Sequence, residues 1–155
     1  MRLILAAAAA ASLIAIGVQA QEAEDPFADA VEMRHGLMLQ MATDVGKMGA
    51  MAKGEVPYDA AAASRAAANL AAIASVLSLE QFPAGSEYEK ATDSFALPAI
   101  WANQDDFLAK IAGLNTAAAA MQTAAGTDLA ALQGGMAALG GACNACHKAY
   151  RQPEE

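Results

Sequence analysis

The sequence predicts an all-α protein built as an antiparallel four-helix bundle. Four segments carry apolar residues at steps of three and four, the spacing that gives a helix one apolar face. Glycine, proline or a capping residue separates each segment from the next. The chain has 155 residues, 56% of them hydrophobic, so its length fits one domain with a single core.

The first predicted helix follows Asp25 and Pro26, which suit the N-cap and the first helical position. Its seam runs in alternating four- and three-residue steps through Phe27, Val31, Arg34, Met38, Met41, Val45, Met48 and Ala52. Gly54 and Pro57 end the helix. Most methionines at this spacing suit adaptable core packing, whereas the charge of Arg34 on an apolar seam requires a partner.

The second predicted helix spans about residues 60–79 and is rich in alanine, which favours helix and lets neighbouring helices approach closely. Residues 81–97 show no clear period, so we predict one long connection whose aromatic side chains pack over the end of the bundle. The third helix begins near Pro98 and ends at Gly126, and Thr127 caps the fourth. Four polar residues are expected to face solvent in the third helix: Asn103, Asp105, Asp106 and Lys110.

The fourth helix carries the pattern Cys143, Cys146, His147, which is the attachment signature of c-type haem. Residues three and four apart share a helix face, so the two thiols and the imidazole point the same way. The thiols then add to the haem vinyl groups while His147 binds the iron. We therefore predict one covalent haem c per chain, attached in the last helix. A flat group lying close to the backbone also explains four costly helix glycines: Gly134, Gly135, Gly140 and Gly141.

Three other interpretations of the two cysteines are open. A zinc site requires two more ligands, and the only other histidine is the distant His35. A thioredoxin-like redox pair requires a preceding strand, which the pattern does not show. A structural disulfide in a helical interaction module leaves His147 without a role.

Residues 1–20 resemble a cleaved secretory signal peptide. Arg2 supplies a positive start, residues 3–18 are apolar, and Val18-Gln19-Ala20 is a small-residue cleavage site. A membrane anchor is the weaker alternative, because the side chains are small and polar residues follow the cleavage site at once. The mature protein of residues 21–155 is then expected in the periplasm, without membrane insertion. Covalent haem attachment and two cysteines both suit that oxidising compartment.

Acidic residues dominate the mature chain. Without Arg2, eight basic residues face seventeen acidic ones, a net charge near −9. Nucleic acid is therefore excluded as an expected partner, whereas a positively charged redox partner is compatible with this charge. No catalytic constellation beyond the haem motif stands out, so we do not expect an enzyme.

The mature chain resembles the class II cytochromes c, which comprise cytochrome c′ and its low-spin relatives. The resemblance is carried by residues 33–38 and 52–59, by Ile100-Trp101, and most specifically by residues 143–151. It implies a four-helix bundle with thioether sites at Cys143 and Cys146 and His147 as the proximal ligand.

The resemblance also assigns residues around the haem. Arg34 matches the arginine beside a haem propionate, which supplies the partner that its charge requires, and Arg151 matches an arginine near the proximal histidine. Met38 matches the residue that faces the distal side of the iron. His35 stands next to the propionate arginine, where it either touches a propionate or faces solvent, and we favour solvent.

Two functions follow from the resemblance. The first is periplasmic electron transfer with a redox partner protein whose identity the sequence does not reveal. The alternative is the binding of nitric oxide or carbon monoxide at an open distal haem face. Ligation of the iron by Met38 favours the first and an open site the second, and we favour ligation because an unhindered thioether binds iron. The family often dimerises through its first two helices, so the resemblance implies a homodimer as one assembly open to this chain.

Overall fold

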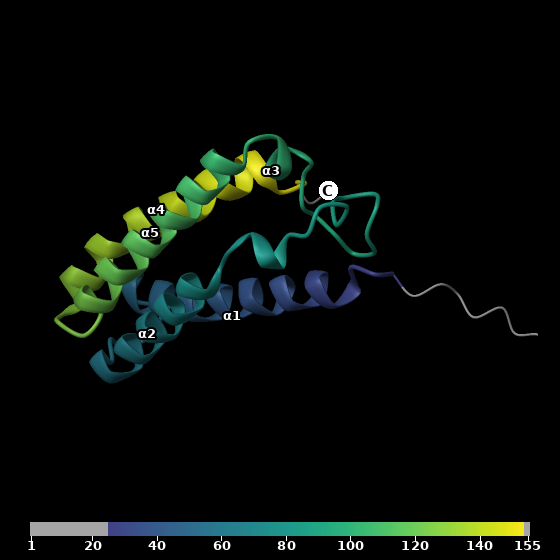
Figure 1. Ribbon diagram of the computed structural model, residues 1–155. Coiled ribbons are helices and arrows are strands. Elements are labelled where there is room, and N and C mark those ends of the chain that lie inside the picture. Colours follow the sequence, from purple (N-terminus) through teal and green to yellow (C-terminus); the bar gives the residue numbers. More distant parts are fainter. Residues whose placement is uncertain (1–24, 154–155) are drawn as a thin grey trace, which may run out of the picture.

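Four long helices run alternately in opposite directions, which confirms the predicted all-α bundle (Figure 1). The computed structural model describes residues 25–153, so the predicted signal peptide at residues 1–20 lies outside the described residues. The long helices are α1 (Ala28–Ala52), α2 (Ala60–Val76), α4 (Gln104–Ala124) and α5 (Leu129–Tyr150). The connection between α2 and α4 holds the 3₁₀ turn η1 (Leu79–Gln81) and the short helix α3 (Ala99–Ala102).

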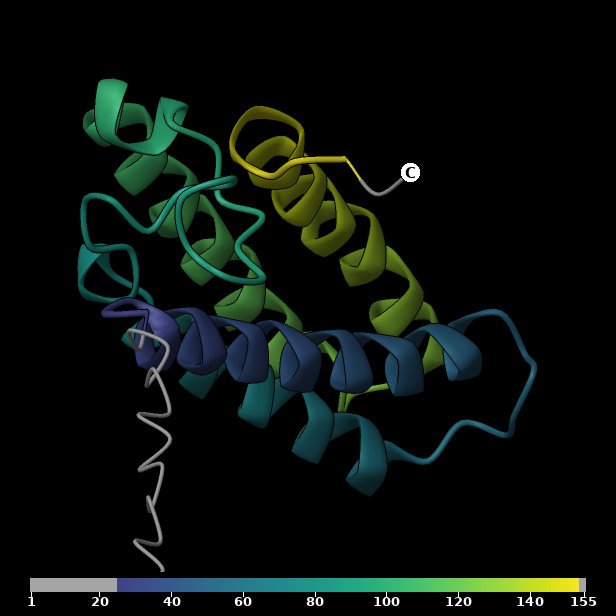
Figure 2. The ribbon, with the colours of Figure 1, turned by 90° about the vertical axis from the view of Figure 1, so that its right-hand side faces the viewer.

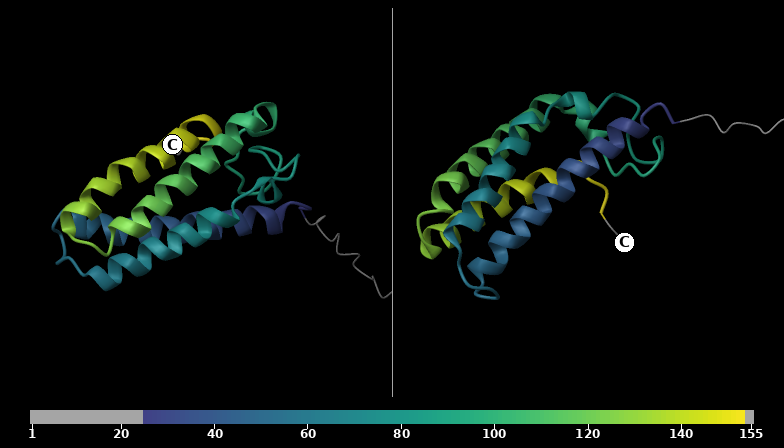
Figure 3. Two further views of the ribbon diagram at one scale, coloured as in Figure 1. Left: turned by 60° about the vertical axis from the view of Figure 1, so that its left-hand side comes forward. Right: turned by 90° about the horizontal axis from the view of Figure 1, so that it is seen from below.

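The helices form two layers, α1 with α2 and α4 with α5. The main contacts follow the order α1–α2–α4–α5 and close through α1–α5. The layers meet at the end that holds the turns after α1 and α4, and they diverge toward the end that holds residues 77–103 (Figures 1 and 3). Figure 2 shows the two layers crossing at an angle, with the long connection and the C-terminal end of α5 at the open side.

Local capping chemistry sets the ends of the helices and corrects several predicted boundaries. Asp59 caps α2 by accepting from the Ala62 N–H at 3.0 Å, and Asp128, rather than Thr127, caps α5 by accepting from the Ala131 N–H at 2.8 Å. Asp25 does not cap α1, because its carboxylate accepts from the backbone N–H groups of Phe27 and Thr92 instead, at 2.8 and 2.6 Å.

Two predicted helices are shorter or interrupted in the structure. The second ends at Val76 rather than near Leu79, because Leu77 adopts an extended backbone. The third is broken at Asn103, whose non-helical φ and ψ of −135° and 53° separate α3 from α4. The indole N–H of Trp101 donates to the Phe82 carbonyl at 3.0 Å and so fastens α3 to the long connection.

The core confirms the predicted packing of small against large side chains. Ala63, Ala67 and Ala74 of α2 are fully buried, as close approach of the neighbouring helices requires. The largest fully buried apolar side chains come from all four long helices and α3: Met48, Leu70, Ile100, Met121, Leu132 and Leu139. No helix in the described part of the chain is long and apolar enough to span a membrane.

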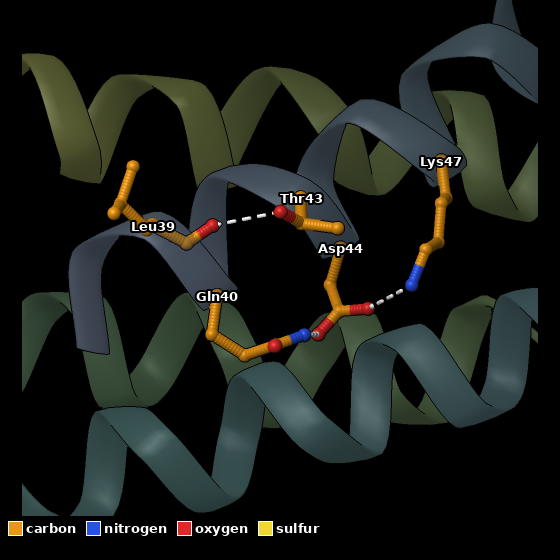
Figure 4. Close-up of polar contacts among 5 residues, drawn as sticks. All are labelled: Leu39, Gln40, Thr43, Asp44 and Lys47. Atoms are coloured by element: carbon orange, nitrogen blue, oxygen red, sulfur yellow. Dashed lines mark hydrogen bonds and ion pairs between the residues drawn. The ribbon is translucent and has the colours of Figure 1, made fainter. Parts of the chain in front are cut away.

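Asp44 is a buried residue of α1 that the seam did not predict. Its side chain is fully buried on the side of α1 that faces α2, and it accepts hydrogen bonds from Gln40 Nε2 at 2.8 Å and Lys47 Nζ at 3.0 Å (Figure 4). Burial raises the pKa of this carboxyl, but the hydrogen bonds from Gln40, Lys47 and Asn69 and the charge of Lys47 outweigh burial and lower the pKa below its ordinary value. Asp44 therefore stays ionised inside the α1–α2 layer.

Candidate haem-binding site

Two adjoining cavities lie between the layers toward the end where they diverge. Their volumes are about 320 and 440 Å³. They share walls from α1, α4, α5 and the long connection, formed by Met38, Leu39, Phe82, Phe107, Cys146, His147 and Arg151. Most of these walls are apolar, so the cavities suit a flat hydrophobic group with a few polar anchors.

All six residues predicted for the site line these cavities. Arg34, Met38, Cys146, His147 and Arg151 line the smaller one. The larger one adds Cys143. Residues 34 and 38 come from α1, whereas the other four come from the last turns of α5 and the residue after it. The antiparallel packing of α1 and α5 brings these distant segments together.

The two cysteines are free thiols on the α5 wall. Both side chains are half-buried, and burial raises the pKa of Cys143. Burial and the neighbouring Cys143 raise the pKa of Cys146 to about 11. A raised pKa favours the protonated thiol over the thiolate at neutral pH.

Arg34 is a buried cation whose hydrogen-bond partners in the chain are neutral. Its Nη1 donates to the Gln81 carbonyl at 3.3 Å and to Ser86 Oγ at 2.9 Å. Its Nη2 donates to the Ser86 carbonyl at 2.8 Å and to Ser94 Oγ at 2.5 Å. The guanidinium carbon also lies 5.3 Å from the centre of the Phe82 ring. From the sequence we expected a haem propionate to be the partner of Arg34. The structure shows that Gln81, Ser86 and Ser94 of the chain itself already accept hydrogen bonds from it.

The positive charge of Arg34 nevertheless remains uncompensated by these partners. None of its hydrogen-bond acceptors is a carboxylate, only 4% of the residue is exposed, and desolvation lowers its pKa. The two Nη atoms share these four neutral acceptors, and the residue lines the smaller cavity. A buried cation of this kind favours a nearby anion.

These features fit a haem. Two thiols and an imidazole stand on one wall, a thioether comes from the opposing α1, and a buried cation lies at the side. Within residues 25–153, no group of three or more His, Cys, Asp and Glu side chains is placed to hold a bare metal ion, so the zinc interpretation finds no site there.

Sequence reasoning missed an aromatic wall between the two sides of the site. The rings of Phe82, Phe107 and Tyr150 pack edge to face, with centroid distances of 5.0 and 5.2 Å, and all three line the smaller cavity. Phe82 was expected only to cover the bundle end. Tyr150 carried a usable signal, because it lies one turn beyond His147 on the same helix.

Other expectations about the surroundings of the site need correction. His35 lines the smaller cavity, half-buried, with its ring 6.1 Å from that of Phe95, rather than facing solvent. Lys110, also expected in solvent, lines the larger cavity. At Gly135 an added Cβ would meet Met121 Cε at 2.8 Å, so helix packing rather than haem explains this glycine. At Gly134, Gly140 and Gly141 nothing in the described chain comes that close, and the haem explanation stays a prediction.

The long connection links the two sides of the cavities. The Ser86 and Ser94 hydroxyls hold it to Arg34 of α1. At its other end the Leu97 N–H donates to the Tyr150 carbonyl at 2.9 Å, and the Gln152 N–H donates to the Phe95 carbonyl at 2.8 Å. The end of α5 that carries His147 is therefore fixed against the same loop as Arg34.

Comparison with known proteins agrees with this geometry. A family model described as Cytochrome C′ matches residues 29–151, which is most of the chain. The chain belongs to the cytochrome c′ family. The resemblance to class II cytochromes c is thereby confirmed, and membership implies haem c as the cofactor.

Individual members of the family cover the chain almost completely. It is 55% identical to cytochrome c-554 of Cereibacter sphaeroides, over 99% of this chain and 100% of that protein. It is 35% identical to a cytochrome c′ of the same organism, over 97% of this chain and 98% of that protein. The solved cytochrome c′ of Rhodobacter sphaeroides superimposes with a TM-score of 0.79 at 34% identity, over 83% of this chain and 98% of that one.

Proposed function

We propose that the protein is an exported c-type haem protein that transfers electrons, with one haem bound through thioethers to Cys143 and Cys146 and iron ligated by His147. The observation that carries this proposal is the convergence of all six predicted site residues on two adjoining cavities. The proposal also agrees with the high identity to a protein named cytochrome c-554.

The residues that line this site have different roles. When bound, haem supplies an iron that cycles between the ferric and ferrous states. Cys143 and Cys146 would attach the group to α5, and His147 of the same helix would bind its iron. The rings of Phe82, Phe107 and Tyr150 would give the bound group an apolar surrounding, in which nearby charges act more strongly than in water. The uncompensated Arg34 then stabilises an anionic substituent and favours the reduced state.

Met38 decides how the distal face is used. Its side chain lines both cavities opposite the α5 wall, as a sixth ligand must. Histidine–methionine ligation raises the potential of a c-type haem and closes the site to gases. We infer that Met38 is the sixth ligand.

A second candidate function is the binding of small diatomic gases. The observation that favours it is the cavity space around Met38 and Leu39 on the distal side. A solved nitric oxide complex of a cytochrome c′ mutant from Alcaligenes xylosoxidans is 31% identical to this chain with a TM-score of 0.72, over 81% of this chain and 95% of that one. Here an iron without Met38 would stay five-coordinate and admit neutral gases.

The absorption spectrum of the ferrous protein, with and without carbon monoxide, separates the two functions. Electron transfer with Met38 ligation predicts sharp low-spin bands that carbon monoxide barely changes. A broad high-spin spectrum that responds at once to carbon monoxide would support gas binding instead. Reversible reduction and reoxidation by small redox mediators is the second requirement, and its failure would contradict an electron carrier.

Export to the periplasm is part of the proposal. It is supported by the signal-peptide pattern of residues 1–20 and by the covalent haem motif. Cell fractionation with determination of the mature N-terminus tests it: we expect a periplasmic protein that begins at Gln21. An uncleaved protein in the membrane fraction would contradict this part.

A further inference from the structure

A polar network joins α4 to α5 beside the candidate haem site. The Tyr150 hydroxyl donates to Asp106 Oδ2 at 2.6 Å. On the other side of the same carboxylate, Lys110 Nζ lies 3.3 Å from Asp106 Oδ1. Tyr150 is buried, and the side chains of Lys110 and Asp106 are 32% and 53% exposed. The carboxylate is thus held between a phenol and an ammonium group.

Two of the three members of the network line the cavities, and Asp106, which lines neither, contacts both of them. Tyr150 lines the smaller cavity and Lys110 the larger. After burial and Cys143, the charges that act on the pKa of Cys146 are those of Lys110, which lowers it, and Asp106, which raises it. One positive and one negative charge therefore lie near the place where the group would be attached.

We propose that Asp106 and Lys110 form a charge pair at the haem site in which each charge offsets the effect of the other on the reduction potential, with Tyr150 as the residue that positions Asp106. This inference rests on the proposed function. A negative charge near the iron stabilises the ferric state, and a positive charge stabilises the ferrous state. Lys110 is partly buried at the larger cavity, so its charge is less screened than one on an open surface, whereas Asp106 is more exposed. In the intact pair the two effects oppose each other.

Two single variants of the haem-loaded full chain test the proposal through the midpoint potential. Asp106→Asn leaves Lys110 unopposed, so the potential rises. Lys110→Gln leaves Asp106 unopposed, so the potential falls. In each case we expect the ratio of ferric to ferrous protein at a fixed ambient potential to change at least about twofold, in opposite directions. The double variant removes both charges and returns the potential toward that of the parent.

Asp105→Asn is the matched control. It makes the same change of charge on the neighbouring exposed position of α4, whereas the contacts with Tyr150 and Lys110 are made by Asp106. Its potential is expected to stay close to that of the parent. Tyr150→Phe keeps both charges and is expected to move the potential less than either charge variant.

The outcomes distinguish a failure of the charge pair from a failure of the proposed function. Covalent haem in every variant with shifts in the same direction, or no larger than that of Asp105→Asn, would overturn the charge pair and leave the proposed function intact. A Tyr150→Phe shift as large as that of Asp106→Asn would assign the effect to the hydrogen bond and also overturn the charge pair. A parent protein without covalent haem would overturn the proposed function and this inference with it.

Discussion

Replacing Arg34 with leucine tests the double role that the structure gives to this residue. Arg34 fastens the long connection to α1 through four hydrogen bonds, and it also places a positive charge at the cavity. Arg34→Leu removes both. Arg34→Lys keeps the charge but cannot reproduce a planar guanidinium that donates in two directions.

The expected loss of stability follows from the hydrogen bonds. Ser86 O keeps a donor after the replacement, because Ser94 Oγ also donates to it at 2.6 Å. Gln81 O and Ser86 Oγ lose the bonds that Arg34 makes, and a hydrogen bond to a charged group contributes about 1.5–3 kcal/mol. The replacement also removes the desolvation cost of a buried cation, and this gain offsets part of the lost free energy of unfolding. We therefore expect Arg34→Leu to lower the free energy of unfolding by roughly 2–4 kcal/mol.

Urea unfolding of the haem-loaded protein measures this loss, and mediated redox titration measures the charge effect. Arg34→Leu should unfold at lower urea and show a lower midpoint potential, because the lost cation favoured the ferrous state. Arg34→Lys should lose stability but largely keep the potential. Arg65→Leu, which removes an exposed cation from α2, should stay within about 0.5 kcal/mol of the parent. An Arg34→Leu protein within about 1 kcal/mol of the parent would contradict a stabilising role for these hydrogen bonds.

Three further replacements probe the ligands and the buried carboxylate. Met38→Ala should convert a low-spin ferrous spectrum into one that responds to carbon monoxide, and an unchanged spectrum would show that Met38 does not bind iron. His147→Ala should keep the haem attached by mass but alter the iron spectrum, so an unaltered spectrum would remove the proximal assignment. Asp44 has a folded-state pKa below its ordinary 3.8, so the stability it contributes is complete above that pH and is lost as the pH falls through the folded value. Asp44→Asn should therefore cost stability at pH 7, with the difference from the parent narrowing toward pH 3 in urea unfolding; a difference independent of pH would contradict the ionised buried carboxylate.

Periodicity and one motif were enough to predict the bundle and which residues line the cavities from α1 and α5. The seam of α1 placed Val31, Arg34, Met41 and Met48 in the interior, where the structure has them. The spacing of Cys143, Cys146 and His147 placed them on the cavity side of one helix. Such predictions depend on local geometry, which a helix fixes by its period of 3.6 residues.

What the sequence could not predict depends on contacts between distant segments. Nothing in the local pattern shows that Ser86 and Ser94 bind Arg34, or that the loop around Phe95 is fastened to the end of α5. The burial of Asp44 is similar, because polar residues are expected outside until a partner from another position, here Asn69 of α2, is known. The break at Asn103 likewise reflects the attachment of α3 to the connection rather than a helix-breaking residue.

Covalent haem attachment is tested by the intact mass of the mature protein, produced with and without the haem-attachment machinery. We expect the machinery to add the mass of one haem, and replacement of both Cys143 and Cys146 with serine to abolish the gain. A mass equal to that of the bare mature chain under both conditions would contradict it.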